Sequence, residues 1–211
     1  MAGCTEGTAL STPAVVAPLV LASASPRRRD LLTAAGWEHS VQAADADETF
    51  LEGETALQGC ERVAALKAAT VASGLTSGSA LGGDTIVVQD DEVLGKPVDR
   101  EDAERMLRAL SGRTHQVVSA VAIQRADGLA VSGLARSVVR FEPLDDAVVT
   151  TYLDGGEWQG KAGGYAIQGQ GGAFARLEEG VLDTVIGLPM ELVNILAEEL
   201  GMLLQERETA S

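Results

Sequence analysis

The sequence has little cysteine, few aromatic residues and no long apolar run. Its two cysteines, Cys4 and Cys60, are too few for a disulfide framework or a cysteine-rich zinc site. The first residues lack the basic segment and apolar core of a secretory signal, and no apolar stretch approaches the length of a membrane span. These absences exclude a disulfide-stapled secreted domain and predict a cytoplasmic protein with no membrane partner.

Basic residues are also scarce. The chain has 16 Lys and Arg residues against 31 Asp and Glu residues, which gives a formal net charge of −15. Nucleic-acid binders present a basic face, so we do not expect nucleic acid as a partner. A small anionic ligand remains compatible with this composition, because a local basic pocket can work within an acidic surface.

The 211 residues can form one large domain or two small ones. Because no polar linker and no repeat of fixed period divides the chain, we predict a single domain over residues 18–205. Residues 1–17 are predicted to form a loose tail, since chain ends that nothing ties down are often disordered.

Strand and helix patterns are interspersed along the chain, which predicts an α/β or α+β fold with a mixed sheet. Residues 155–172 hold eight glycines, too many for a regular element. Apolar runs predict strands over residues 19–22, 37–44, 80–89, 92–94, 116–124 and 134–141. Residue spacing and capping signals predict helices that begin at residue 26 and cover residues 55–73, 100–110, 145–153 and 188–204.

Three consecutive arginines follow a Ser-Pro pair in the stretch SASPRRR, directly after the first predicted strand. Ser25 suits a helix N-cap and Pro26 suits the first helical position, so free amides and the helix dipole favour an anion there. Ser23, Arg27 and Arg28 could add hydroxyl and guanidinium donors for a polyphosphate. A capped helix with a solvated arginine run explains the local pattern equally well.

Asp84 lies within an otherwise aliphatic stretch that predicts a strand. Together with Gly82 and Gly83, it is expected to interrupt that strand. A carboxylate there is costly unless it is paired, hydrated or metal-bound. The two glycines allow a ligand or another backbone to come close. Asp84 could ligate Mg²⁺ or orient a water for attack, or it could cap a turn at the end of the strand.

Four further positions have weaker signals. Lys67 lies on the apolar stripe of the second helix, and Lys96 lies in a hairpin return; each could meet a phosphate or stay solvated. Glu48, next to Asp47 in an acidic loop, could supply oxygen ligands to Mg²⁺ or face solvent. Gln168 could read a base edge from the glycine-rich segment, or that segment could be a loop without a ligand.

Together these stretches resemble the Maf family of nucleoside triphosphate pyrophosphatases. The resemblance runs from about Leu19 to Leu196, and several separated motifs in the right order are far more specific than any one of them. The motifs are SASPRR at residues 23–28, GDT at 83–85, GKP at 95–97, LSGRTH at 110–115, KAGGYAIQG at 161–169 and GLP at 187–189.

The resemblance implies a central mixed β-sheet flanked by helices, like that of Maf and inosine-triphosphatase-like proteins. It also implies hydrolysis of a nucleotide between its α- and β-phosphates, with a divalent cation such as Mg²⁺ or Mn²⁺ held near Glu48 and Asp84. Asp84 matches the proton acceptor. The positions that match phosphate contacts are Ser23, Arg27, Arg28, Lys67 and Lys96.

Arg27, Thr85 and Gln168 match positions tied to substrate choice, and the form of the KAGGYAIQG motif resembles the branch that acts on dTTP and UTP. The chain departs from many relatives at Gly160 and Leu182, and both changes fall near the expected base-binding side. Two alternatives remain, a pyrophosphatase for another base and a nucleotide-binding regulator of cell division with little catalysis. The family also suggests a homodimer.

Overall fold

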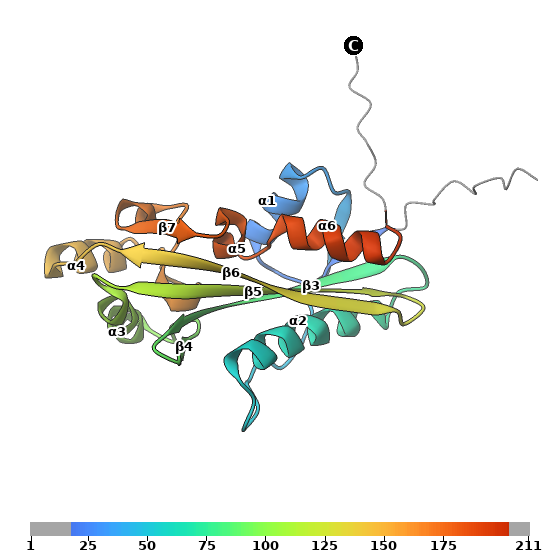
Figure 1. The fold of residues 1–211 in the computed structure, drawn as a ribbon, viewed down its shortest axis with the longest axis horizontal. Coiled ribbons are helices and arrows are strands. Elements are labelled where there is room, and N and C mark those ends of the chain that lie inside the picture. Colours follow the sequence, from blue (N-terminus) through green and yellow to red (C-terminus); the bar gives the residue numbers. More distant parts are fainter. Residues whose placement is uncertain (1–17, 203–211) are drawn as a thin grey trace, which may run out of the picture.

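A computed structural model describes residues 18–202 of the chain (Figure 1). The tail predicted over residues 1–17 lies outside the described residues, as do residues 203–205 at the end of the predicted domain. The single-domain boundaries therefore stay a prediction. Every helix within residues 18–202 is too short or too polar to cross a membrane.

The fold is built on a seven-stranded mixed sheet, in which β1 runs parallel to its neighbours β2 and β3 and the other pairs are antiparallel. The strand order is β2-β1-β3-β5-β6-β7, with β4 paired to β3. This arrangement confirms the predicted mixed α/β class. The strands are β1 Leu19–Leu21, β2 His39–Val41, β3 Ser79–Gln89, β4 Glu92–Leu94, β5 Thr114–Arg125, β6 Ala130–Phe141 and β7 Ala175–Glu179.

Helices cover both faces of the sheet: α2 and α3 lie on one face, and α1, α5 and α6 lie on the other (Figure 1). Two short 3-10 helices, η1 (Ala162–Gly164) and η2 (Gln170–Ala173), occupy the glycine-rich segment that was predicted to be irregular. The α-helices are α1 Pro26–Ala34, α2 Ala56–Ala72, α3 Arg100–Leu110, α4 Asp146–Asp154, α5 Leu182–Ile186 and α6 Met190–Glu199.

Local capping chemistry fixes where the helices near the site begin. The Ser25 side chain accepts a hydrogen bond from the Arg28 amide and Pro26 opens α1, as the sequence predicts. Thr55 and Gln58 form a reciprocal capping box at the start of α2. Short-range signals therefore fix where the two helices beside the site begin.

Three predictions about elements were wrong. Strand β3 is not interrupted at residues 82–84, because Gly82, Gly83 and Asp84 pair in register with β5. The last helix ends at Glu199 instead of residue 204, and Gly201 follows with a positive φ of 68°. Strand β7 and helix α5 are absent from the elements predicted from the sequence.

Candidate active site

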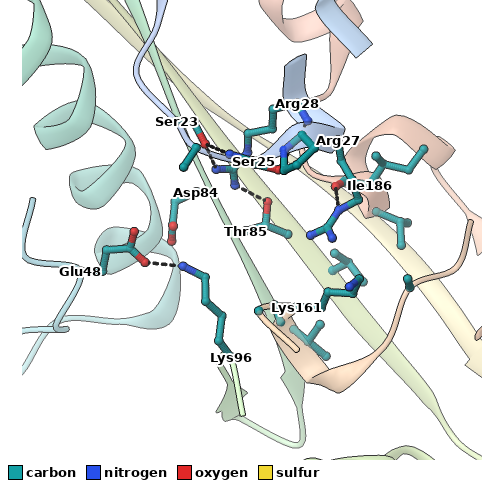
Figure 2. Close-up of a pocket in the computed structure, with 18 of the residues that line it drawn as sticks. Ser23, Ser25, Arg27, Arg28, Glu48, Asp84, Thr85, Lys96, Lys161 and Ile186 are labelled. Carbon is teal, nitrogen blue, oxygen red and sulfur yellow. Dashed lines mark hydrogen bonds and ion pairs between the residues drawn. The ribbon is translucent and has the colours of Figure 1, made fainter. Parts of the chain in front are cut away.

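A cleft of about 510 Å³ opens where the β1–α1 turn, β3 and the glycine-rich segment meet. Figure 2 shows side chains from these elements pointing towards one another around it. Asp47 does not line this cleft; its carboxylate accepts the Thr49 amide in the exposed loop instead. All the other residues singled out for a role do line it: Ser23, Arg27, Arg28, Glu48, Lys67, Asp84, Thr85, Lys96 and Gln168.

Arg28 joins three segments of the chain at the wall of the cleft. Its guanidinium donates to the Ser23 hydroxyl at 3.1 Å, the Thr85 hydroxyl at 3.1 Å and the Gly187 carbonyl at 2.8 Å. Burial lowers the pKa of Arg28, and the nearby Asp84 carboxylate opposes part of that change. These hydrogen bonds from the guanidinium hold Ser23, Thr85 and Gly187 together at the cleft wall. The guanidinium also places a positive charge near Asp84.

Arg27 points into the cleft from the first turn of α1 (Figure 2). Its Nε donates to the Ile186 carbonyl at 3.3 Å, and the side chain is half-buried. Burial lowers the pKa of Arg27, while Tyr152 and then Glu157 act in the opposite direction. A guanidinium in this position can meet an anionic ligand from the helix side.

Asp84 is the deepest acidic group of the cleft, at 8% exposure on strand β3. The Lys67 ammonium lies 3.0 Å from its Oδ1 and 2.8 Å from the Oε1 of Glu48. Lys96 meets the other oxygen of Glu48 at 2.8 Å. The four side chains thus form a continuous chain of opposite charges across the cleft floor, and the alternative of Asp84 as a turn cap is wrong.

Glu48 is held as a carboxylate by this arrangement. Burial raises its pKa, but hydrogen bonds and charge interactions with Lys67 and Lys96 together outweigh that effect and lower it to about 2. The side chain is 43% exposed, so it remains open to a ligand in the cleft.

Gly82 explains how a lysine on α2 reaches Asp84. A Cβ at residue 82 would lie 2.2 Å from the Ala64 carbonyl oxygen and 2.7 Å from the Ala68 amide. Only glycine therefore lets the helix backbone come this close to β3. The expectation of a close backbone approach is confirmed at Gly82, whereas the Arg28 side chain is the nearest neighbour of a Cβ at Gly83. The close packing at Gly82 places Lys67 beside Asp84.

One cation can contact both acidic side chains of the cleft, because the Lys67 ammonium already does so. Carboxylate oxygens are the ligands that Mg²⁺ and Mn²⁺ prefer, so the donor chemistry of Glu48 and Asp84 fits such a cation. Within residues 18–202 no group of three or more Asp, Glu, His or Cys side chains gathers at one point. Further oxygen ligands can come from main-chain carbonyls, a bound phosphate or water.

The glycine-rich segment closes the other side of the cleft. Gln168 and Lys161 both line it, and burial lowers the pKa of Lys161, with Arg27 as the next cause. Lys161 belongs to the KAGGYAIQG motif, but we did not predict it as a site residue. The motif was the signal that could have identified it, since a lysine among glycines is free to approach an anion.

The chain matches proteins of known family over most of its length. A family model described as "Maf-like protein" matches residues 18–200. A protein from Shewanella sp. (strain MR-7), named "dTTP/UTP pyrophosphatase", is 45% identical over 87% of this chain and 98% of its own length. One of the same name from Pseudoalteromonas translucida is 47% identical over 81% of this chain and 90% of its own.

A more distant likeness comes from a solved structure, described as a "Nucleoside-triphosphatase / dITP/XTP pyrophosphatase" from Mycobacterium abscessus. It covers 88% of this chain and 97% of that chain, with 14% identity and a TM-score of 0.45. A likeness at that level supports no inference about the ligand of this cleft.

Proposed function

The chain belongs to the Maf family, and on that premise we propose that it hydrolyses dTTP and UTP to the nucleoside monophosphate and pyrophosphate. The observation that carries the proposal is the cleft floor, where a buried carboxylate, Asp84, lies among the cationic groups of Lys67, Lys96 and Arg28. The names of the relatives, which cover most of the chain, support this choice of substrates.

The cationic side chains of the cleft suit a substrate with several negative charges. We assign contacts with the triphosphate to four side chains that line the cleft from helices α1 and α2 and from the loops before α1 and after β4, namely Ser23, Arg27, Lys67 and Lys96. Charge develops on the leaving pyrophosphate in the transition state, and fixed cations stabilise it without reorganising when the bond breaks. Arg28 contributes its charge from behind and holds Ser23 and Thr85 in place.

We assign the role of general base to Asp84. A carboxylate on a rigid strand can take a proton from the water that attacks the phosphoanhydride, which typically contributes about 10²–10⁴-fold in rate. The ammonium of Lys67, 3.0 Å away, orients the carboxylate. The proton passes to Asp84 as the new phosphorus–oxygen bond forms, and the electron pair of the broken bond leaves with pyrophosphate.

Glu48 and Asp84 are the residues that would hold a divalent cation, Mg²⁺ or Mn²⁺. When bound, such a cation supplies further positive charge to the phosphate oxygens. Thr85 and Gln168, at the wall and rim of the cleft, are proposed to contribute to the choice of base together with Arg27. A homodimer and a cytoplasmic location stay predictions from the family resemblance and the sequence.

Pyrophosphate release from dTTP, UTP, CTP and GTP, with and without Mg²⁺ or Mn²⁺, tests this proposal. We expect release from dTTP and UTP to exceed that from the other two nucleotides and to stop when a chelator removes the metal. Preference for CTP or GTP would favour the pyrophosphatase for another base. Nucleotide binding without pyrophosphate release would favour the regulator.

A further inference from the structure

The segment that carries Gln168 is rich in glycine, and main-chain turns in which the Gly169 and Gly172 amides donate are its internal hydrogen bonds next to Gln168. Gly169, Gly171 and Gly172 follow Gln168 closely, and glycine loses more conformational freedom on ordering than any other residue. The Gln168 side chain is itself exposed at the rim of the cleft. Such a glycine-rich segment needs contacts with other parts of the fold if it is to hold the Gln168 side chain in one position.

Glu157 supplies such contacts. Its Oε1 accepts the Gln170 amide at 3.2 Å and its Oε2 accepts the Gly171 amide at 3.3 Å. Within residues 18–202 this carboxylate forms no salt bridge, so the backbone amides are its main partners. A Cβ at Gly169 would lie 1.9 Å from Oε1, which shows how closely the carboxylate packs against the turn.

A second contact comes from the same part of the fold. Tyr152, near the end of α4, accepts the Ala166 amide on its hydroxyl oxygen at 3.1 Å. Tyr152 is buried near the end of α4, and Glu157 lies in the turn three residues after the helix ends at Asp154, so the end of α4 and the turn that follows it supply both acceptors. Together they bind the backbone on either side of Gln168, at residues 166, 170 and 171.

We propose that Glu157 is a positioning residue for the nucleoside end of the cleft, fixing the turn that presents Gln168 to the base. This inference rests on the proposed function, since it assigns Glu157 a part in recognising the same substrates. Its charge also acts on Arg27, where Tyr152 and then Glu157 oppose the effect of burial, which lowers the pKa of the guanidinium. Among the described residues, its hydrogen bonds go to the turn at residues 170 and 171 and not to Lys67 or Asp84.

Glu157→Gln is the direct test, because an amide keeps the size of the side chain but offers one acceptor oxygen in place of two. We expect KM for UTP to rise about tenfold, the effect of losing one charge-assisted hydrogen bond. The preference for UTP over GTP in kcat/KM should fall by a similar factor, while kcat changes less than about twofold. The inhibition constant for pyrophosphate should change much less than KM for UTP, since Glu157 acts on the phosphate contacts only through its charge on Arg27.

Glu101→Gln serves as the matched control, because Glu101 is an exposed carboxylate in the first turn of α3. Tyr152→Phe removes the hydroxyl that accepts the Ala166 amide and interacts with Glu157, and it should raise KM for UTP in the same direction by a smaller factor. If Glu157→Gln does not fold, KM for UTP in Tyr152→Phe tests the inference, and an unchanged KM in that variant would contradict it.

An unchanged KM and an unchanged UTP preference in a folded Glu157→Gln protein would overturn the inference. A parallel rise in KM and in the inhibition constant for pyrophosphate would also overturn it, because it would indicate general damage to the cleft. Both results require an active wild-type enzyme. A wild-type protein that releases no pyrophosphate from any nucleotide contradicts the proposed function instead, so the two failures are distinguishable.

Discussion

At the residue scale, the cleft depends on one lysine that contacts two carboxylates. Lys67 is only 5% exposed and contacts both Asp84 and Glu48. A buried ammonium is costly unless it is paired with an opposite charge. The two carboxylates neutralise the charge of Lys67, and Lys67 in turn lowers the cost of burying Asp84. The same contacts fix the direction of Asp84, which is what a general base on a rigid strand requires.

Replacing Asp84 tests its assigned role directly. Asp84→Asn keeps the shape of the side chain but removes its capacity to accept a proton, so we expect kcat for dTTP to fall by about 10²–10⁴-fold. Binding of dTTP, measured by calorimetry at a temperature where turnover is slow, should change little. A purified Asp84→Asn protein with nearly normal kcat would show that another group takes the proton.

At the element scale, the active-site geometry depends on how closely helix α2 packs on strand β3. The Ala64 carbonyl and the Ala68 amide occupy the space where a side chain at residue 82 would begin. Lys67 lies between these two residues on the helix, so any displacement of α2 also moves its ammonium away from Asp84.

Gly82→Ala should therefore reduce both stability and activity. We expect a loss of about 1–3 kcal/mol in the free energy of unfolding, which is typical of an overpacked interior, and a drop in kcat. Chemical denaturation and steady-state kinetics measure the two effects. Gly74→Ala is the control, because a Cβ there meets only the Val71 carbonyl oxygen at 3.6 Å. Equal stability in the two variants would contradict the packing argument.

Helices whose starts depend on capping residues could be predicted from the sequence. A strand that depends on pairing with a distant strand could not. The starts of α1 and α2 follow from Ser25, Pro26 and Thr55, which act within one turn. Strand β7 was missed because four of its five residues are exposed, so it lacks an alternating apolar pattern. It exists because its backbone pairs with β6.

At the scale of the whole molecule, the residues that line the cleft could be predicted from the sequence, but the individual contacts of each side chain could not. The motifs placed Arg27, Asp84 and Gln168 in one site because the family resemblance spans nearly the whole chain. The contacts of Arg28 with Gly187 and of Glu157 with a backbone turn could not be predicted, since they depend on tertiary packing and on main-chain atoms.

The stability of the whole molecule should depend on pH through His115. This side chain is 3% exposed, its Nε2 bonds the Tyr165 hydroxyl at 2.8 Å, and its buried Nδ1 has no partner among the described residues. Burial lowers its pKa from 6.5 to about 4. Between pH 6.5 and about pH 4, His115 of the unfolded chain binds a proton and His115 of the folded chain does not. The free energy of unfolding therefore keeps its full value above pH 6.5 and falls as the pH drops towards 4.

We expect this group to contribute about 3 kcal/mol to the loss of stability between pH 7 and pH 4. The measurement compares urea denaturation at the two pH values for the wild-type protein and for His115→Gln, which keeps a polar side chain but does not titrate. The free energy of unfolding should fall less steeply in the variant. The same fall in both proteins would show that His115 does not carry this dependence.

The central claim is that the cleft directs water to the bond between the α- and β-phosphates of a pyrimidine nucleoside triphosphate. Phosphorus NMR of the products formed from dTTP tests it most directly. We predict equal amounts of dTMP and pyrophosphate from the wild-type protein with Mg²⁺, and almost no product from Asp84→Asn in the same time. Formation of dTDP and orthophosphate, or no cleavage of dTTP by the wild-type protein, would contradict the account.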